Sequence, residues 1–490
     1  MSNSVHVKKV NVDAIMENLP PQQRWIDHLK EDLLPFWTFE DALGVPAGNF
    51  PTYRNNDGTT ACKENPSSEF KKCLEDPDLR GLVKLNRQYC RAQSRQSYAY
   101  GIAFHMTGDE KYLKLCKAGV DYMRETFIDK SGKGVFTYKK LDTGENAPKA
   151  LQRTSQDMAY ALTGIGFYYY LTHDEEVLPD IINIKEYIFN TYYDKDLGLF
   201  KWLIEESEED GSPKQKELVA QLDQIYAYML WLTPSLPEPY QSEWKDDLCK
   251  IAKIMIMQFF SEEYQFFWGT VTDCNTRKIG APHTDFGHSI KTLWLIYQIG
   301  KINGDINMVN FSRDKASRII NTAYIEETGS WARRFDEEGN LDYDKEWWIL
   351  AELDQTAATL GLIDSSFLEY LPQTYDYWFK YMVDHRKRTD NSKIGGIWHM
   401  VDGKTNSPKE EYPKQHSWKN SLHTFEHALV GYLTTGQIKG INSKLYFAFK
   451  NQEDCVKYMH PYFYLGKLTL KTVHYDGIFK KYEVEVTDLR

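Results

Sequence analysis

The chain has 490 residues, of which 42% are hydrophobic and 26% are charged, a composition typical of a globular protein long enough to bury a large core. Its net charge of −11, with no cluster of basic residues, excludes nucleic acid as the main partner, because phosphate binding requires clustered Lys and Arg. The most apolar stretch, residues 251–260, is about half as long as a membrane span, and the first 20 residues lack the apolar run of a secretory signal. We therefore expect no membrane partner.

Two residue classes narrow the function further. The seven cysteines are scattered and never form a Cys-x-x-Cys pair, which predicts reduced thiols in a cytoplasmic protein rather than disulfides or a zinc site. Aromatic residues make up 14% of the chain, more than core packing usually needs. Flat apolar rings with polar edges stack well against the faces of sugars, so this composition favours a carbohydrate ligand.

After an expected N-terminal arm at residues 1–20, a short glycine-and-aromatic element recurs along the chain. Its aromatic positions 50, 136, 200, 268, 331 and 398 are 86, 64, 68, 63 and 67 residues apart. Gly, Asn or Asp turn signals follow four of these elements within about ten residues, which predicts short hairpins or extended loops. The elements are Gly48-Asn49-Phe50, Gly134-Val135-Phe136, Gly198-Leu199-Phe200, Phe267-Trp268-Gly269, Gly329-Ser330-Trp331 and Gly396-Ile397-Trp398.

The segments between these elements are helical in pattern. Apolar residues recur at i, i+3, i+4 and i+7 in residues 94–108, 154–178, 218–232, 287–300, 346–362 and 422–436. A repeat of ~65 residues holds two ordinary helices and their connections, so six repeats predict twelve helices. Because no polar capping repeat stands at either end, we predict a closed (α/α)6 barrel over residues 21–438 rather than an open solenoid.

The last part of the chain breaks this pattern. From residue 439 to 490, several short runs alternate between apolar and polar residues, and the pair Asp476-Gly477 between two of them is typical of a hairpin turn. We predict a small C-terminal β-rich extension that covers an edge of the barrel, as terminal segments often do.

The predicted helix at 287–300 carries a candidate acid or base. His288 and Lys291 share one face near its start, and a histidine there can take or give a proton near neutral pH. A hydrogen-bonded core histidine is the alternative.

Two other segments carry candidate binding residues. In the next predicted inner helix, Trp348 and Glu352 lie one turn apart, so an aromatic ring that can stack on a sugar lies beside a carboxylate that can accept hydrogen bonds from sugar hydroxyls. Arg95 opens an aromatic helix and offers a permanently charged fork of donors for an oxyanion.

The helix at 422–436 contains His423-x-x-Glu426-His427, with Trp418 five residues before it. Taken alone, this pattern matches an inverted zinc-peptidase motif, in which two histidines hold zinc and the glutamate activates water. Such a site also needs an acidic ligand on a later helix, and the residues that follow are predicted to form strands. A zinc peptidase is therefore the less favoured interpretation.

The order of these motifs resembles the N-acylglucosamine 2-epimerase family, which includes cellobiose 2-epimerases and aldose-ketose isomerases. The likeness covers about residues 20–435. It rests on Phe-Trp near residue 37 followed by Gly-x-Phe, on Arg95 opening an aromatic helix, on an Asp-x-Ala-aromatic helix, and on three later motifs. Those are Gly287-His288 with Trp294, Lys345-x-Trp347-Trp348-x-x-x-Glu352, and Trp418-Lys419-x-x-x-His423.

The resemblance implies a function for these residues. His288 and His423 would be the acid/base pair of a sugar 2-epimerase or aldose-ketose isomerase, and Arg95 would hold the C1 or C2 oxygen. Trp348, Glu352 and Trp418 would line the sugar site. The reaction removes the C2 proton beside the aldehyde, passes through a cis-enediolate and returns a proton, and it needs neither cofactor nor metal.

Three positions depart from the family pattern. Lys291 stands where a glutamate is usual, Gln224 or its neighbours where another histidine is usual, and Glu426 where an arginine is common. These changes invert local charges. One interpretation is a swapped Lys291–Glu426 ion pair around the same catalytic core. Another is a substrate other than a simple neutral sugar. A third is a barrel that has become a binding protein without catalytic activity. We include Lys291 and Gln224 among the predicted substrate-binding residues.

Functions from other classes stay open at this stage. A glycoside hydrolase or lyase on the same barrel would need two carboxylates about 5 to 9.5 Å apart. The candidates are Asp157, Asp223, Asp285 and Glu352. A non-catalytic barrel would bind sugars without turnover. A homodimer is one assembly compatible with the sequence, which does not fix the oligomeric state.

Overall fold

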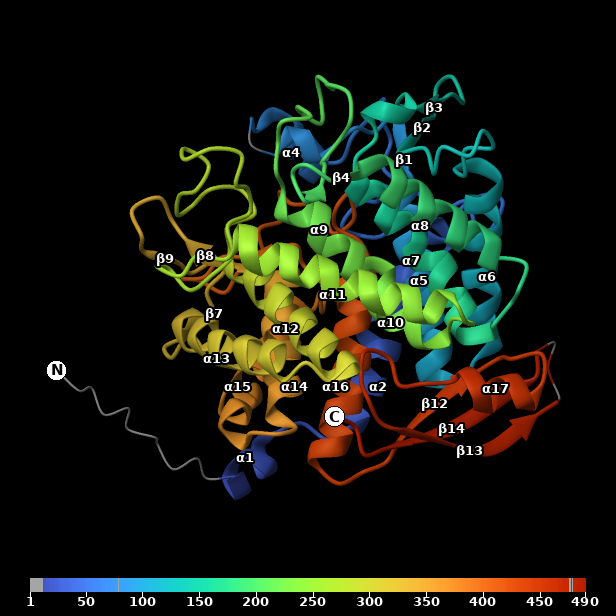
Figure 1. The fold of residues 1–490 in the computed structure, drawn as a ribbon, viewed down its shortest axis with the longest axis vertical. Coiled ribbons are helices and arrows are strands. Elements are labelled where there is room, and N and C mark those ends of the chain that lie inside the picture. Colours follow the sequence, from blue (N-terminus) through green and yellow to red (C-terminus); the bar gives the residue numbers. More distant parts are fainter. Residues whose placement is uncertain (1–11, 78, 476, 478) are drawn as a thin grey trace.

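The computed structural model describes residues 12–77, 79–475, 477 and 479–490. Within these residues, six helical segments form an inner ring in which almost every side chain is buried. Each packs against the next, and the last closes the ring against the first (Figure 1). They are α5 (Cys90–Thr107), α7 (Ser155–Thr172), the continuous run α9 (Leu218–Gln224), η5 (Ile225–Met229) and α10 (Leu230–Leu232), α12 (Phe286–Asn303), α14 (Trp347–Gly361) and α16 (Leu422–Ile438).

An outer ring of amphipathic helical segments covers the inner one. In α6, for example, Leu113, Val120 and Met123 are buried toward the inner helices while the opposite face is polar. The outer segments are the run α2 (Gln23–Asp27), η1 (His28–Leu33) and α3 (Leu34–Trp37), then α6 (Glu110–Thr126), α8 (Leu178–Tyr192), α11 (Tyr240–Phe259), α13 (Ile306–Ala323), and the pair α15 (Leu371–Tyr377) and η8 (Trp378–Met382). This alternation confirms the predicted (α/α)6 barrel.

The predicted glycine-and-aromatic elements lie where outer helices return to inner ones. In the described residues, five of them pair antiparallel with the chain just after an outer helix, as in Phe260 with Phe267 and Val383 with Ile397. Phe50 is instead held by an inner helix, because its N–H donates to Gln93 Oε1 at 3.0 Å. The pairs that form named strands are β4 (Tyr193–Asp194) with β5 (Leu199–Phe200) and β6 (Tyr324–Ile325) with β7 (Ser330–Trp331).

The two ends of the barrel differ in their connections. The long connections lead into the inner helices, whereas the inner helices leave through short turns, such as Gly108-Asp109 after α5. The long connections contain α4 (Ser68–Glu75), η2 (Glu40–Ala42), η3 (Arg80–Leu82), η4 (Ala150–Gln152), β1 (Arg87–Tyr89), β2 (Tyr138–Lys140), β3 (Asn146–Ala147), β8 (Arg334–Phe335), β9 (Leu341–Asp342), β10 (Lys345–Glu346) and β11 (Met400–Val401). Helix α1 (Val12–Asn18), η6 (Thr233–Ser235) and η7 (Ser365–Glu369) complete the helical segments before the extension.

Residues after α16 form the predicted β-rich extension, at the end where the inner helices finish. Its antiparallel sheet has the order β12-β14-β13, and a short helix follows the first strand (Figure 1). The elements are β12 (Ser443–Phe447), α17 (Gln452–Tyr458), β13 (Lys467–His474) and β14 (Lys481–Thr487). In the predicted hairpin turn, Asp476 lies outside the described residues. Residues 1–11 of the predicted N-terminal arm do so as well.

The extension does more than cover an edge. Its side chains Leu445, Phe447 and Tyr462 belong to the same buried apolar cluster as the barrel helices. Among the described helices, none is both long enough and apolar enough to cross a membrane.

The inner helices α5 and α7 approach closely at Gly164. A Cβ atom added there would lie 2.6 Å from the backbone oxygen of Ser94, and the Gly164 N–H donates to Ser94 Oγ at 2.8 Å. We therefore expect Gly164→Ala to force the two helices apart and to lower the unfolding free energy by about 1–3 kcal/mol. Urea denaturation measures this change.

The matched control is Gly81→Ala, at an exposed glycine where an added Cβ meets no heavy atom within 4 Å. That substitution should change the unfolding free energy by no more than about 0.5 kcal/mol. Equal effects of the two substitutions would contradict the close approach of α5 and α7.

Candidate active site

A cavity of about 490 Å³ opens at the end of the barrel where the inner helices begin. The described residues that line it include most of the predicted site residues. These are Arg95, His288, Lys291, Trp348, Trp418 and His423. The structure therefore brings together side chains from four inner helices and from the loop before α16, although they lie far apart in the sequence.

His288 is oriented by the residue that caps its own helix. Asp285 precedes α12, and its Oδ1 accepts from the His288 backbone N–H at 2.7 Å while its Oδ2 lies 2.6 Å from His288 Nδ1. Burial alone would raise the pKa of Asp285, but the His288 charge and hydrogen bonds hold it below its usual value. An ionised Asp285 requires a proton on Nδ1, which leaves Nε2 as the basic nitrogen.

Trp348 contacts both candidate histidines. Its ring centroid lies 4.6 Å from that of His288 and 5.8 Å from that of His423. The contact with α12 depends on Gly287, because a Cβ atom there would lie 2.6 Å from the Trp348 ring. Trp348 Nε1 also donates to Glu346 Oε1 at 2.9 Å, which fixes the ring orientation.

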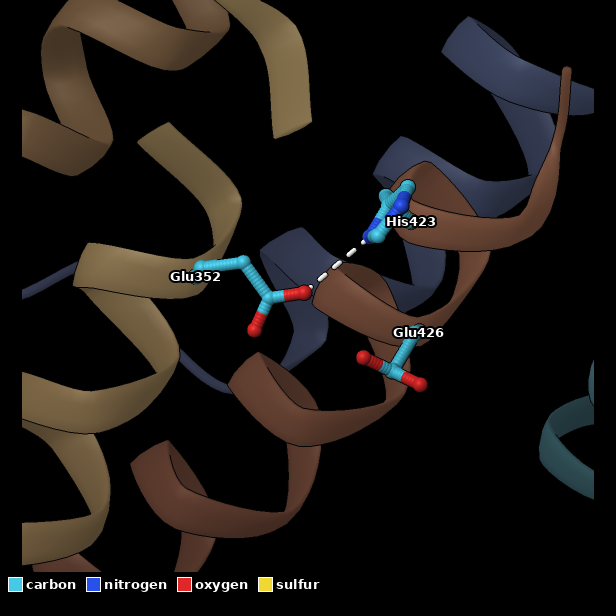
Figure 2. A group of neighbouring side chains, drawn as sticks. All are labelled: Glu352, His423 and Glu426. Carbon is cyan, nitrogen blue, oxygen red and sulfur yellow. Dashed lines mark hydrogen bonds and ion pairs between the residues drawn. The ribbon is translucent and has the colours of Figure 1, made fainter. Parts of the chain in front are cut away.

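His423 is almost fully buried, with 8% of its surface exposed. Its Nδ1 lies 3.1 Å from Glu352 Oε1 and 3.0 Å from the Tyr226 hydroxyl (Figure 2 shows the glutamate contact). Among the described residues, none makes a hydrogen bond to its Nε2. Burial lowers the pKa of His423 well below its ordinary value, and the charges of Lys291 and Arg95 lower it further. The imidazole is therefore neutral at pH 7 and can accept a proton.

Two buried carboxyl groups lie beside this imidazole. The ligand atoms of Glu352, His423 and Glu426 all lie within 4.8 Å of one another (Figure 2). Gln355 Nε2 bridges the carboxyls, at 3.4 Å from Glu352 Oε2 and 3.2 Å from Glu426 Oε1. Burial raises the pKa of both glutamates, and repulsion from Glu426 adds to the rise at Glu352. The pair therefore favours one shared negative charge near neutral pH.

Lys291 pairs with a carboxylate other than the one considered from the sequence. Its Nζ lies 3.0 Å from Asp223 Oδ1 and 3.5 Å from the centre of the Tyr226 ring. The swapped Lys291–Glu426 ion pair is thus replaced by a Lys291–Asp223 pair, because Asp223 projects toward α12. Burial alone would lower the pKa of Lys291, but the Asp223 charge raises it above its usual value.

Arg95 and Trp418 meet at another wall of the cavity. The Arg95 guanidinium lies 3.6 Å from the centre of the Tyr160 ring, and its NH1 donates to the Trp418 backbone oxygen at 3.0 Å. Its buried Nε has no hydrogen-bond partner among the described residues. Because Arg95 lines the cavity, its permanently charged guanidinium can hold an oxygen of a bound ligand.

Gln224 lies away from the cavity. Its side chain donates to the Ser155 backbone oxygen at 3.1 Å and accepts from the Tyr228 hydroxyl at 3.4 Å. The neighbouring residues Asp223 and Tyr226 face the site instead. Sequence reasoning named Asp223 only as a hydrolase candidate and missed Tyr226. The three-residue spacing of these two polar side chains in an apolar helix was the available signal.

The His423-x-x-Glu426-His427 motif does not bring its two histidines together. His427 Nε2 lies 3.1 Å from Asp354 Oδ2, and its ring packs 4.4 Å from that of Trp378. In the described part of the chain, the group that could hold a metal ion is Glu352, His423 and Glu426. The zinc-peptidase arrangement is therefore wrong for this helix, because His427 faces a different part of the barrel.

Comparison with known proteins agrees with the geometry. The sequence matches the family described as N-acylglucosamine 2-epimerase over residues 78–423. A cellobiose 2-epimerase of Ruminococcus albus is 23% identical over 352 residues, which cover 67% of this chain and 83% of that protein.

Solved structures show the same fold. The cellobiose 2-epimerase of Spirochaeta thermophila superimposes with a TM-score of 0.68 at 16% identity, over 88% of this chain and all of that one. A D-mannose isomerase superimposes with a TM-score of 0.63 at 14% identity, over 88% of this chain and 100% of that one.

The Lys291–Asp223 pair offers a test of the charge network. Asp223→Asn or Lys291→Met leaves one buried charge without its partner, so each should lower the unfolding free energy by about 3–5 kcal/mol. The double substitution removes both charges and should cost clearly less than the sum of the single ones. Urea denaturation of the four proteins measures the coupling. Strictly additive losses would show that the two side chains do not pair.

Proposed function

Because the chain belongs to the N-acylglucosamine 2-epimerase family and is an isomerase of the epimerase type, we propose that it inverts C2 of a reducing sugar with His288 and His423 as the acid/base pair. One observation carries the proposal. Two imidazoles, each with Nδ1 beside a carboxyl group, line one cavity and contact the same Trp348 ring. Each keeps Nε2 available to a substrate carbon.

The proposed reaction begins with the open-chain aldehyde. Nε2 of one histidine removes the C2 proton, and the electrons of that C–H bond form the C1–C2 double bond of a cis-enediolate. Arg95 stabilises the negative charge on the C1 or C2 oxygen, and its place in the cavity wall supports this role. The second histidine, which must enter this step as an imidazolium, gives its Nε2 proton to the opposite face of C2, and the aldehyde forms again. The first histidine keeps the proton taken from C2, and both histidines return to their starting states by proton exchange with solvent. Two bases on opposite faces favour epimerisation, whereas a single base moving a proton between C1 and C2 would give isomerisation.

The surroundings favour a neutral sugar. Lys291 is already paired with Asp223 and stacked on Tyr226, so its charge is not free for an anionic substituent. A second cavity of about 780 Å³ shares Trp202, His283 and Trp418 with the first. Further sugar units of a disaccharide or longer substrate would extend into it from the reducing end.

The hydrolase alternative receives less support, because three of its four candidate carboxylates are held by a basic partner. Asp157 pairs with Arg91, Asp223 with Lys291, and Asp285 with His288. A carboxylate that is held ionised by a cation is poorly suited to protonate a leaving group.

The test follows deuterium at C2. Reducing sugars, first monosaccharides and then disaccharides, are incubated with the protein in heavy water and analysed by NMR. We expect incorporation at C2 with formation of the epimer. His288→Asn and His423→Asn should each reduce turnover by about 10²- to 10⁴-fold while leaving the fold intact. Each variant should still exchange the proton of one epimer without inverting it, which identifies the base for that face.

The control is His474→Asn, in strand β13 of the extension, which should keep full turnover. Wild-type protein that incorporates no deuterium into any sugar would contradict the proposal. Full turnover in either active-site variant would show that the acid/base pair is a different one.

A further inference from the structure

His283 lies where the two cavities meet, and the proposed inversion at C2 does not use it. It lines both the cavity that contains His288 and the second cavity of about 780 Å³. Its side chain is 43% exposed, against 13% for His288 and 10% for His423. Its ring centroid lies 5.1 Å from that of His288. A third imidazole is therefore adjacent to the first and more open to solvent.

A turn that packs against a glycine fixes the position of His283. This residue has a φ of 58°, in the left-handed region of the backbone. The Gly269 N–H donates to the side chain of the next residue, Thr284 Oγ1, at 3.0 Å. A Cβ atom added at Gly269 would lie only 2.6 Å from His283 Cβ. The missing side chain at Gly269 thus lets the turn pack closely and hold His283 at the mouth of the cavity.

A buried carboxylate faces one nitrogen of His283. Glu217 Oε2 lies 3.5 Å from His283 Nδ1, and the Glu217 side chain is 10% exposed. An ionised Glu217 favours a proton on Nδ1. Among the described residues, none makes a hydrogen bond to Nε2 of His283. Nε2 is therefore the nitrogen that can exchange a proton with a sugar in the cavity.

Four titratable groups face His283 from the elements packed around it, and they set its charge. They are Glu217, Asp223, Asp285 and His288. Burial alone would lower the pKa of His283, but the hydrogen bond and charge of Glu217 raise it above its ordinary value. The charges of Asp285 and Asp223 raise the pKa further. His283 therefore keeps its second proton to a higher pH than an ordinary histidine, as an acid catalyst near neutral pH requires.

The reaction of a cyclic sugar contains a step that needs such an acid. Before C2 can react, the C1–O5 bond must break, O5 must gain a proton and O1 must lose one. Because O1 and O5 are both bonded to C1, the acid and the base for this step must lie side by side. His283 and His288 meet this requirement. The other adjacent imidazoles of the cavity, His399 and His416, are hydrogen-bonded to each other at 3.0 Å.

We propose that His283 is the acid that opens the sugar ring, and that the protein interconverts the anomers of reducing sugars as an activity separate from inversion at C2. The inference rests on the proposed function for its substrate class. The His283 imidazolium gives its Nε2 proton to O5, which keeps the electrons of the broken C1–O5 bond. His288 Nε2 takes the O1 proton, and the electrons of the O1–H bond form the C1–O1 double bond. Ring closure on the other face of C1 reverses both proton transfers and gives the other anomer.

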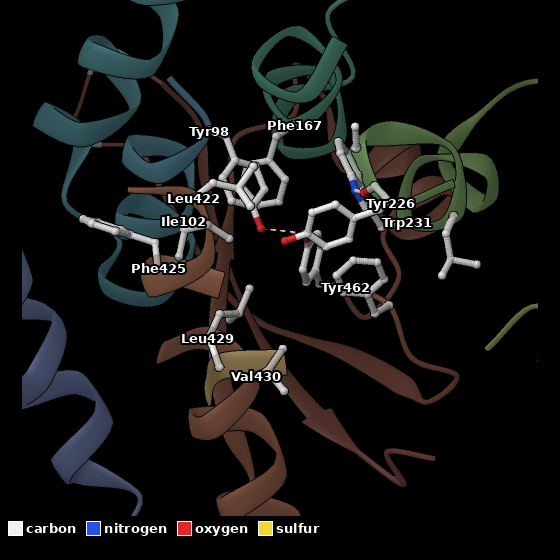
Figure 3. Packing of buried hydrophobic residues seen from close by; sticks show 14 of the residues in the cluster. Tyr98, Ile102, Phe167, Tyr226, Trp231, Leu422, Phe425, Leu429, Val430 and Tyr462 are labelled. Atoms are coloured by element: carbon white, nitrogen blue, oxygen red, sulfur yellow. Dashed lines mark hydrogen bonds between the residues drawn. The ribbon is translucent and has the colours of Figure 1, made fainter. Parts of the chain in front are cut away.

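Ring opening also prepares the next step. It leaves His288 as an imidazolium, the form that a proton donor to C2 requires when His423 removes the C2 proton. His283 is then neutral and regains its proton from solvent. Deeper in the barrel, the aromatic side chains of Tyr98, Phe167 and Tyr462 pack together and are at most 1% exposed (Figure 3). Proton exchange therefore takes place at the mouth of the cavity, where His283 lies.

The test follows anomer interconversion by polarimetry, from freshly dissolved α-D-glucose, α-D-mannose and a reducing disaccharide in weak buffer. Wild-type protein should accelerate it, and His283→Asn should reduce the catalysed rate by about 10²-fold while leaving the fold intact. The matched control is His474→Asn. His474 is 34% exposed, and its Nε2 lies 4.0 Å from Glu483 Oε2, so it is also a partly exposed histidine near a glutamate. This control should keep the wild-type rate.

A second variant separates acid catalysis from packing. Glu217→Gln removes the negative charge that raises the pKa of His283 but keeps a side chain of the same size. The step requires the imidazolium, so the rate falls as the pH rises through this pKa. In the variant, the fall should begin about one pH unit lower than in the wild type. An unchanged pH profile would overturn the proposal, because His283 would then have only a structural role.

Polarimetry does not depend on inversion at C2. If wild-type protein interconverts anomers but forms no epimer, the proposed function fails and the role of His283 stands. Wild-type protein that accelerates anomer interconversion for none of the sugars would overturn the proposal, even if it forms epimers. A wild-type rate in His283→Asn would overturn it as well, and in both cases the C2 deuterium measurement still decides the proposed function.

Discussion

The burial of two carboxyl groups, Glu352 and Glu426, side by side inside a closed ring of helices is the constraint on which the rest of the site depends. Neither carboxyl group is exposed to solvent, so the pair favours a single negative charge near neutral pH. Hydrogen-bond donors must stabilise that charge. Glu426 accepts hydrogen bonds from side chains of other inner helices and of the C-terminal extension. His423 lies against the same pair, with its Nδ1 3.1 Å from Glu352 Oε1. The C-terminal extension therefore contacts the carboxyl pair beside the cavity, through Tyr462.

Much of the fold follows from local patterns in the sequence. The glycine-and-aromatic elements lie between outer and inner helices, and five of the six begin with a glycine of positive φ, which permits the turn. The spacing of these elements gives the number of helical pairs, and the contact between α16 and α5 closes the ring. Most residues predicted from family resemblance on α5, α12, α14 and α16 meet at one cavity, whereas Glu352 is fully buried beside it. Their catalytic roles stay predictions.

The contacts between side chains of different helices could not be derived from the periodicity of the sequence. Gln224 and Asp223 are adjacent in α9, so their side chains point to different faces, and the family resemblance did not fix which of them faces the site. The partner of Lys291 depends on a contact between helices 68 residues apart in sequence. The contact between the C-terminal extension and the inner helices could not be predicted either. Alternation in residues 439–490 predicts strands, but it does not predict where the loop before β13 packs. From this loop Tyr462 donates to Glu426 Oε2 at 3.1 Å.

The central claim is that two imidazoles act on opposite faces of one substrate carbon. A crystal structure of the wild-type protein with a sugar alcohol, which mimics the open-chain substrate but cannot react, tests it most directly. We expect C2 to lie between the Nε2 atoms of His288 and His423, each within about 3–3.5 Å of it, with Arg95 on the C1 or C2 oxygen. A bound alcohol whose C2 lies within reach of only one of these imidazoles, or of neither, would contradict the account.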